Sequence, residues 1–326
     1  MKNYLLDLRQ KLKPLVPVLS MSVHEHGCRW VYGMVRQSNV LSFNAIRCSG
    51  GSDLESGTSI SGDSLNAGLL SGFIQDALGK ISSCGLVKPS AVVYSIPASR
   101  AFMCELVSES GSSEEDLRFQ IEDLLAAAVG DQTDEMVYDW QTKLDTSTND
   151  QGDPLVVAAV LKKLLDEILQ ASKASQLKCL GVTLDNIAAV NGYLQAASKH
   201  HQTGNPKFLL YGEICKHRVR LAVFIEGFLC HESQDFSDQG FSVVQSVASL
   251  EKLVGVWARG DQDQGEGTVR LIVGGDLMAS KTAISTIKRS RLLADKLFEI
   301  RPLPQIREHW HADVVAYGAL EGMPCA

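Results

Sequence analysis

Three short runs of polar residues have side chains that could hold a metal ion. Residues 24–26 are His-Glu-His and residues 309–311 are His-Trp-His, so each run offers two imidazoles. Alternate residues of a strand share a face, so only two ligands would converge, whereas a catalytic zinc site takes three protein ligands. Residues 199–201, Lys-His-His, follow a predicted helix, whose C-terminus favours cations. We therefore favour structural explanations over metal sites: a turn for residues 24–26, an exposed loop with a packed Trp310 for residues 309–311, and a helix end for residues 199–201.

Other reactive side chains carry no pattern that is typical of catalysis. A Gly-x-Ser-x-Gly nucleophile elbow is missing, and none of the eight cysteines has Cys-x-x-Cys spacing. Free thiols in a reducing cytoplasm are therefore expected. Lys288, Arg289 and Arg291 form a small basic patch, for which a solvated helix face is favoured over a contact with lipid or with a motor protein.

Composition and length exclude several classes of protein. The chain has 326 residues, 45% of them hydrophobic, which is enough for a large core and suggests two packed units or one divided domain. Its net charge of −7 argues against a nucleic-acid-binding protein. The longest stretch without a charged residue, 186–198, has 13 residues, whereas a membrane-spanning helix needs about 20. Residues 1–14 form a basic amphipathic lead-in, for which packing on the domain is favoured over a weak membrane contact.

The first part of the chain predicts a small sheet with a helix. Alternating and β-branched residues predict three strands around a turn at Gly27, over residues 15–23, 29–35 and 39–46. The glycine- and serine-rich segment 48–63 is typical of a mobile loop. A helix with one apolar face is expected from 65 to 82, before a buried strand over 91–96.

The second half of the chain repeats this order of elements. Its strands are expected over residues 208–214, 219–225, 228–232 and 268–273, with a helix over 241–257 before the last of them. Gly274 and Gly275 follow, and then a helix, a short strand over 297–300 and a final helix over 312–320. The repetition predicts a duplicated α/β fold with a cleft between the copies, which is a common place for a ligand.

An insert separates the two copies. Its expected order is β-α-β-β-α-β, the ferredoxin-like arrangement, with strands from 100–106 to 179–184. Ser112 and Glu115 have the spacing of a capping box at the start of its first helix.

Several stretches of the chain resemble the type IV pilus assembly protein PilM. They are residues 94–100 (Tyr-Ser-Ile-Pro-Ala-Ser-Arg), 133–140 (Thr-Asp-Glu-Met-Val-Tyr-Asp-Trp), the apolar strand 155–161 with its Leu-rich helix, and 180–186 (Leu-Gly-Val-Thr-Leu-Asp-Asn). The similarity runs from about residue 17 to residue 322 and is most specific between 93 and 194. MshI, from mannose-sensitive haemagglutinin (MSHA) pili, and the cytoplasmic part of GspL are similar relatives, and the divergence from ordinary PilM favours an MshI-like protein.

The resemblance implies an actin-like (ribonuclease H-like) duplicated two-domain fold with the insert as an added subdomain. The implied boundaries are 1–14 for the lead-in, 15–97 for the first half of domain I, 98–184 for the insert, 185–206 for a return helix, 207–310 for domain II and 311–326 for a C-terminal helix on domain I. It also implies a cytoplasmic protein, peripheral to the inner membrane and without a transmembrane span. The implied partner is a PilN-like or MshJ-like single-span protein, whose cytoplasmic tail would bind in a groove beside the insert. Pilus motor ATPases are further implied partners.

The same resemblance implies where a nucleotide would bind. In actin-like proteins two hairpin turns hold the phosphates, and PilM-like sequences carry Asp-x-Gly at both turns. Here the first turn, 21–27, has no Asp, and Tyr211 stands where the second Asp is expected. If a nucleotide binds, the residues implied are Ser22, Gly27, Gly212, Gly274 and Gly275. Because phosphoryl transfer depends on positioned charge and Mg²⁺ needs oxygen ligands, we expect no significant ATP hydrolysis, no catalytic residue and no metal site.

Three classes of function remain to be compared. A scaffold that binds a membrane partner's tail fits the degenerate turns. A weak ATP-binding protein or ATPase of the actin and sugar-kinase superfold is the alternative, with ATP and Mg²⁺ as its cofactors. It would need acidic residues at the turns, where only Glu25 and Glu213 are near and both are out of register. A filament-forming protein is the third class, for which the sequence offers no identifiable interface.

Overall fold

The structure is a computed structural model. It describes residues 15–24, 27–36, 42–53, 65–108, 112–142, 154–199, 206, 208–225, 228–260, 269–299 and 310–320. The predicted lead-in over residues 1–14 lies outside the described residues, and so do Glu25 and His26.

The first half of the molecule is a five-stranded mixed sheet in the order β3-β2-β1-β4-β8. Its strands are β1 (Leu15–His24), β2 (Gly27–Arg36), β3 (Ser42–Asp53), β4 (Ala91–Ile96) and β8 (Lys178–Leu184). The first three pair in antiparallel fashion, and β4 and β8 add in parallel. Both faces of the central strands are covered, which explains why β4 is apolar almost throughout and completely buried.

Helices α2 (Ala67–Ser83) and α4 (Lys162–Ala174) cover one face of this sheet. Asn66 begins α2, because its side-chain oxygen accepts the N–H of Leu69 at 3.0 Å. The apolar stripe of α2 is buried against the sheet through Leu70, Phe73, Ile74, Ala77 and Ile81.

The second half repeats the first. Its four-stranded sheet has the order β11-β10-β9-β12, which matches β3-β2-β1-β4 strand for strand. The strands are β9 (Phe208–Ile214), β10 (Arg218–Ile225), β11 (Phe228–Phe236) and β12 (Val269–Gly274). Helix α6 (Val243–Gly260) covers one face as α2 does in the first half, and α7 (Lys281–Ile287) packs beside it. The predicted duplication is therefore confirmed.

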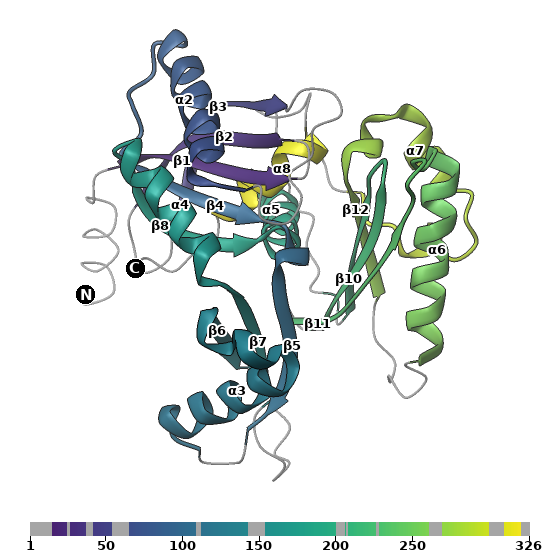
Figure 1. Ribbon diagram of the computed structural model, residues 1–326. Coiled ribbons are helices and arrows are strands. Elements are labelled where there is room, and N and C mark those ends of the chain that lie inside the picture. Colours follow the sequence, from purple (N-terminus) through teal and green to yellow (C-terminus); the bar gives the residue numbers. More distant parts are fainter. Residues whose placement is uncertain are drawn as a thin grey trace, which may run out of the picture.

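Two helices lie between the sheets and join the halves (Figure 1). They are α5 (Asp185–Lys199), which follows β8 directly, and α8 (Trp310–Leu320). The inner face of each sheet packs on them, so one apolar core contains residues from both halves. Gly192 and Gly318 lie at the crossing of the two helices, where their backbones touch.

The insert is smaller than the sequence predicts. The expected order of elements is present, as β5 (Ala101–Val107), α3 (Glu114–Val129), β6 (Met136–Thr142), β7 (Pro154–Leu161), α4 and β8. However, only three of these strands form the insert's sheet, in the order β5-β7-β6, and α3 packs on that sheet. β8 pairs with β4, and α4 packs against α2, so both belong to the first half because that is where their apolar faces are buried.

The capping box of α3 is one residue away from the predicted one. Ser113, not Ser112, precedes the helix, and its hydroxyl accepts the N–H of Asp116 at 3.2 Å. The Asp116 carboxylate in turn accepts the Ser113 N–H at 3.0 Å, so Asp116 takes the place predicted for Glu115.

Strand β3 extends into the segment that the sequence predicts as a loop. It runs over Ser42–Asp53, whereas the prediction ends it at residue 46. The glycines suit this strand because of their neighbours: a Cβ on Gly50 would meet the Trp30 ring at 2.7 Å, and one on Gly51 would meet the Arg29 guanidinium at 2.5 Å. Gly50 and Gly51 therefore let two large side chains of β2 lie across β3.

Two predictions near the C-terminus also differ from the structure. The predicted strand over residues 297–300 is described only as far as residue 299, and there the structure has a single bridge, between Leu271 and Leu297. Helix α8 begins at Trp310, so Trp310 and His311 are helical and the predicted loop is wrong for these two residues.

Substituting Gly318 by Ala tests the close crossing of α5 and α8. A Cβ at this position would overlap the carbonyl oxygen of Ala188, so we expect the free energy of unfolding to fall by about 2 kcal/mol or more, as overpacking does. Gly72→Ala is the matched control, because Gly72 lies on the exposed side of α2 with open space around it. That change should raise stability by about 0.5–1 kcal/mol through helix propensity. Urea denaturation followed by circular dichroism measures both; equal effects of the two changes would contradict the close crossing.

Candidate functional site

Charged side chains lie on the inner face of the second sheet, in an otherwise apolar setting. Side chains alternate between the two faces of β10. Val219, Leu221 and Val223 face helix α6. Arg218 and Arg220 therefore face the first half of the molecule. Glu213 of β9 is the direct cross-strand partner of Arg220. Arg220 is 1% exposed.

Arg220 is surrounded by three carboxylates from three different elements. Its Nη1 lies 2.8 Å from Oδ1 of Asp185 and 3.7 Å from Oε1 of Glu232 on β11, and its Nη2 lies 3.1 Å from Oε2 of Glu213. Arg218 also contacts Oε2 of Glu213, at 3.0 Å. We call these five residues the central ion cluster.

The cluster joins the two halves of the molecule. Asp185 is the first residue of α5, and its Oδ1 also accepts the backbone N–H of Ala98, at 3.0 Å. The next residue, Asn186, donates from Nδ2 to Oε2 of Glu232 at 2.9 Å. A carboxylate at a helix N-terminus is further favoured by the helix dipole. The start of α5 is therefore attached to the second sheet by two polar contacts.

Opposite charges keep Asp185 and Arg220 ionised although both are buried. Burial alone would raise the pKa of Asp185, but the charge and hydrogen bond of Arg220, with Arg218 and the Ala98 N–H, hold that pKa below its ordinary value. Burial would likewise lower the pKa of Arg220, but Asp185 and Glu213 raise it well above the ordinary value. For Glu232, burial has the largest effect and its pKa is raised, although Arg220 opposes this. The two guanidinium groups thus neutralise most of the charge of three carboxylates.

Tyr211 occupies the place where the resemblance to PilM implies an aspartate. It is buried among apolar residues of the inner core, and its ring packs against Tyr193 of α5 with centroids 6.2 Å apart. Burial raises the pKa of Tyr211 well above its ordinary value, so the side chain remains an uncharged phenol. An oxygen ligand of the carboxylate type is therefore replaced here by an aromatic ring.

The three glycines predicted for the second half of a nucleotide site lie together at the ends of β9 and β12. Each one packs closely against the protein itself. A Cβ on Gly212 would meet Leu250 of α6 at 2.8 Å, and one on Gly274 would meet the Tyr211 and Tyr193 hydroxyls at 2.9 and 3.0 Å. Gly275 has a φ of 100° and lies against the backbone of Ile214. Local packing and backbone conformation are therefore sufficient to explain why glycine occupies these three positions.

The two residues predicted for the first half of that site lie on the β1–β2 hairpin. Ser22 is buried and pairs with Arg29, while Gly27 begins β2 opposite His24. Neither belongs to the central ion cluster, which sequence reasoning did not predict except for naming Glu213 as out of register. The sequence signal for the cluster was the pair Arg218 and Arg220, two residues apart in an apolar strand. Three carboxylates, those of Asp185, Glu213 and Glu232, nevertheless lie at the centre of the molecule.

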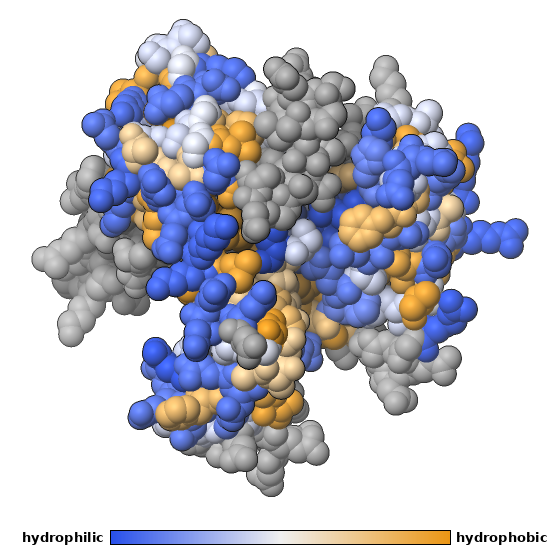
Figure 2. Space-filling view, viewed as in Figure 1, coloured by the Kyte–Doolittle hydropathy of each residue, from blue (hydrophilic) through white to orange (hydrophobic). Residues whose placement is uncertain are grey.

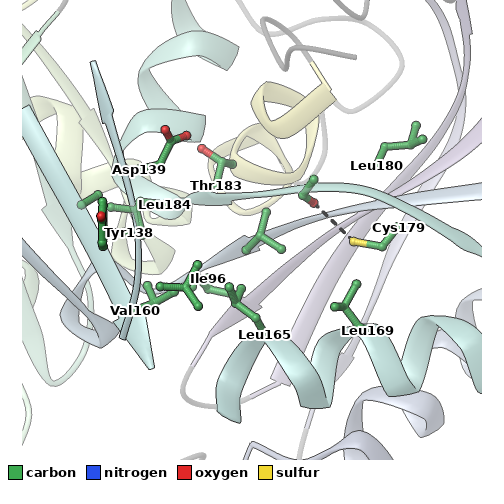
Figure 3. A pocket seen from close by; sticks show the side chains of 14 residues that line it. Ile96, Tyr138, Asp139, Val160, Leu165, Leu169, Cys179, Leu180, Thr183 and Leu184 are labelled. Atoms are coloured by element: carbon green, nitrogen blue, oxygen red, sulfur yellow. Dashed lines mark hydrogen bonds between the residues drawn. The ribbon is translucent and has the colours of Figure 1, made fainter. Parts of the chain in front are cut away.

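A groove between the insert and the first half is the second candidate site. Its cavity measures about 370 Å³ and lies between β8, β6, β7 and α4 (Figure 3). β8 lines it with six consecutive residues, 179–184, and β6 with three, 137–139. Because alternate residues of a strand face opposite sides, consecutive lining residues mean that both strands present their edges to the groove. From α4, Leu165 and Leu169 contribute one helical face, as their spacing of four requires.

Both edges are open in the described part of the structure. β8 is the last strand of the first sheet, and β6 is the last strand of the insert's sheet. Exposed apolar side chains surround the groove, among them Val137 at 40%, Leu161 at 36% and Leu169 at 52% exposure. Figure 2 shows hydrophobic surface where the insert meets the first half. Open strand edges and exposed apolar side chains are features of a docking site for an extended peptide.

Within the described ranges, no group of three or more His, Cys, Asp or Glu side chains could hold a metal ion. In the same ranges, every helix is too short or too polar to cross a lipid bilayer.

Comparison with known proteins identifies the fold. No family model matches the sequence, and none of the curated proteins matches it. Among solved structures, the chain is similar to one described as a PilM–PilN type IV pilus biogenesis complex, with a TM-score of 0.66 and 13% identity over 94% of this chain and 98% of that chain. It is also similar to the cytoplasmic domain of EpsL, an inner-membrane component of the type II secretion system of Vibrio cholerae, with a TM-score of 0.51 and 14% identity over 93% of this chain and 94% of that chain. The chain has the actin-like fold that the resemblance to PilM implies.

Replacing Arg220 by Met tests the central ion cluster. The change leaves buried carboxylates without their cation, so we expect the free energy of unfolding at pH 7 to fall by about 3–5 kcal/mol. Without the guanidinium, burial raises the carboxylate pKa values above those of the unfolded chain, and the folded variant then binds more protons than the unfolded one. The variant should therefore gain stability from pH 7 to pH 5. In the wild type, the lowered pKa of Asp185 gives a contribution that is present at neutral pH and lost in acid.

Guanidinium chloride denaturation at both pH values measures this difference, and Arg118→Met is the control. Arg118 forms an ion pair with Glu114 whose side chains are 57% and 70% exposed, so its loss should leave stability nearly unchanged. If Arg220→Met and Arg118→Met behave alike at both pH values, the cluster does not hold the two halves together.

Proposed function

We propose that this protein is an actin-like scaffold of a type IV pilus or related secretion machine, and within that class an MSHA-type, MshI-like component. The observation that carries the proposal is the likeness to PilM as it occurs in a PilM–PilN complex, which extends over nearly the whole of both chains. The sequence similarity between residues 93 and 194 falls on the elements that build the groove, and this supports the same assignment.

The proposed partner is a single-span inner-membrane protein of the PilN or MshJ type. Its N-terminal cytoplasmic tail would lie extended in the groove, where β8 and β6 offer strand edges and α4 offers apolar side chains. Such a contact would make the protein cytoplasmic and peripheral to the inner membrane. Pilus motor ATPases are a further proposed partner.

We also infer that the nucleotide site is degenerate. The carboxylates at the centre are engaged by Arg218 and Arg220, and the second Asp position is filled by Tyr211. Phosphoryl transfer needs free charge to hold Mg²⁺ and phosphate oxygens, so engaged carboxylates leave little rate. These contacts favour the scaffold over a weak ATP-binding protein or ATPase.

Substituting Leu169 by Asp tests the groove as the tail site. A charge on this wall should weaken binding of a synthetic tail peptide at least tenfold, about 1.4 kcal/mol, because it would be buried against an apolar peptide. The peptide is taken from the single-span protein encoded beside this chain, and fluorescence anisotropy measures the binding. Val256→Asp is the matched control, since Val256 of α6 is 53% exposed, like Leu169 at 52%, and lies outside the groove. Equal binding by both variants, or no binding by the wild type, contradicts the proposal.

Calorimetry with Mg-ATP and a phosphate-release assay test the degenerate nucleotide site. We expect no steady release of phosphate, because the central carboxylates are neutralised within the protein. If instead a phosphate-releasing activity co-elutes with the protein in gel filtration, the result favours the enzyme.

A further inference from the structure

Among the described residues that line the groove, Asp139 of β6 has the single carboxyl side chain, and none is Lys or Arg. Most of the other lining residues are apolar. The Tyr138 hydroxyl donates to Glu122 at 2.9 Å, and burial raises the pKa of the Cys179 thiol, which remains neutral. Asp139 is exposed, and its Oδ1 accepts the backbone N–H of Trp140 at 2.9 Å. Among the described residues, no Lys or Arg forms an ion pair with it.

Asp139 lies where an incoming segment would pass between the two strand edges. In Figure 3 its carboxylate and the Thr183 hydroxyl are on the side of the groove opposite Leu165 and Leu169. Asp139 belongs to the edge of β6 and Thr183 to the edge of β8, so polar atoms from both walls flank the same end. The opposite side is apolar. An occupant therefore meets one anionic position in an otherwise apolar channel.

We propose that the groove selects an extended, mostly apolar segment with one Lys or Arg side chain that pairs with Asp139. An occupant without a cation would cover this carboxylate with apolar atoms, which costs free energy unless the charge is paired. An acidic residue at that position would add repulsion, whereas a Lys or Arg would form a charge-assisted hydrogen bond. The inference rests on the proposed function and specifies the chemistry of the tail.

The class of partner proposed above meets this requirement. Segments on the cytoplasmic side of membrane helices carry an excess of Lys and Arg near the membrane. A tail of that kind can therefore supply the cation that pairs with Asp139. Charge complementarity thus favours a membrane protein's cytoplasmic tail over an acidic or uncharged peptide.

Peptide selection on the intact protein tests the inference. The probe is a random dodecapeptide library displayed on phage, selected in parallel on the wild type, Asp139→Asn, Asp139→Lys and Leu169→Asp. Asp134→Asn is the matched control, because Asp134 is exposed and lies near Asp139 in sequence but outside the groove. Peptides that need an intact groove are those enriched on the wild type and lost on Leu169→Asp. All substituted side chains are exposed, so each variant should fold as the wild type does, which circular dichroism verifies.

The expected result is that groove-dependent peptides share a Lys or Arg at one aligned position. That preference should disappear on Asp139→Asn, change to Asp or Glu on Asp139→Lys, and remain on Asp134→Asn. For a synthetic peptide, replacing its basic residue by Met should weaken binding to the wild type about tenfold and leave binding to Asp139→Asn nearly unchanged, as expected for one ion pair.

Two other results would overturn the inference in distinguishable ways. Groove-dependent peptides without a preferred basic position, bound equally by Asp139→Asn, would disprove the charge selection and leave the groove as a peptide site. A selection that gives no groove-dependent peptide would remove the proposed function as well.

Discussion

The burial of one guanidinium group constrains the whole arrangement. Arg220 is almost completely enclosed, and a charge in that position is tolerated only when carboxylates surround it. Those carboxylates come from β9, β11 and the start of α5, so the first residue of α5 has to lie against the second sheet. The two sheets, the helices between them and the position of β8 all have to be compatible with this contact. Since such a pair is costly to break but not strongly stabilising in itself, its main effect is on geometry.

The cluster joins the two halves through a cation that belongs to the chain itself, Arg220. Tyr211, packed against Tyr193, stands where the resemblance to PilM implies a carboxylate. The glycines at the ends of β9 and β12 are in close contact with protein atoms. The space between the halves is therefore used for internal contacts, and the proposed docking site lies elsewhere, beside the insert.

Sequence patterns predicted those parts of the fold that depend on local periodicity. The duplication, the apolar strands and the helix over residues 67–83 follow from alternation and from a helical stripe of apolar residues. The patterns did not predict which sheet β8 joins, because parallel pairing with β4 depends on contacts distant in sequence. They also missed the part of β3 that contains Gly50 and Gly51. Glycine is required at these positions because the Trp30 and Arg29 side chains of the neighbouring strand lie against them. The ion cluster was missed for the same reason, since Asp185 and Arg220 meet only in the folded chain.

The cluster and the groove are connected through β8. Residues 179–184 form one edge of the groove, and the next residue, Asp185, is held by Arg220 and by the Ala98 N–H. Ile96, two residues before Ala98, also lines the groove. The buried contact therefore fixes the end of the strand whose edge would receive a peptide. A wall that is fixed in advance reduces the ordering cost of binding, so an extended peptide can bind with fewer contacts than a mobile wall would require. On this argument, the central ion cluster supports the proposed peptide site at a distance, by keeping one edge of the groove in place.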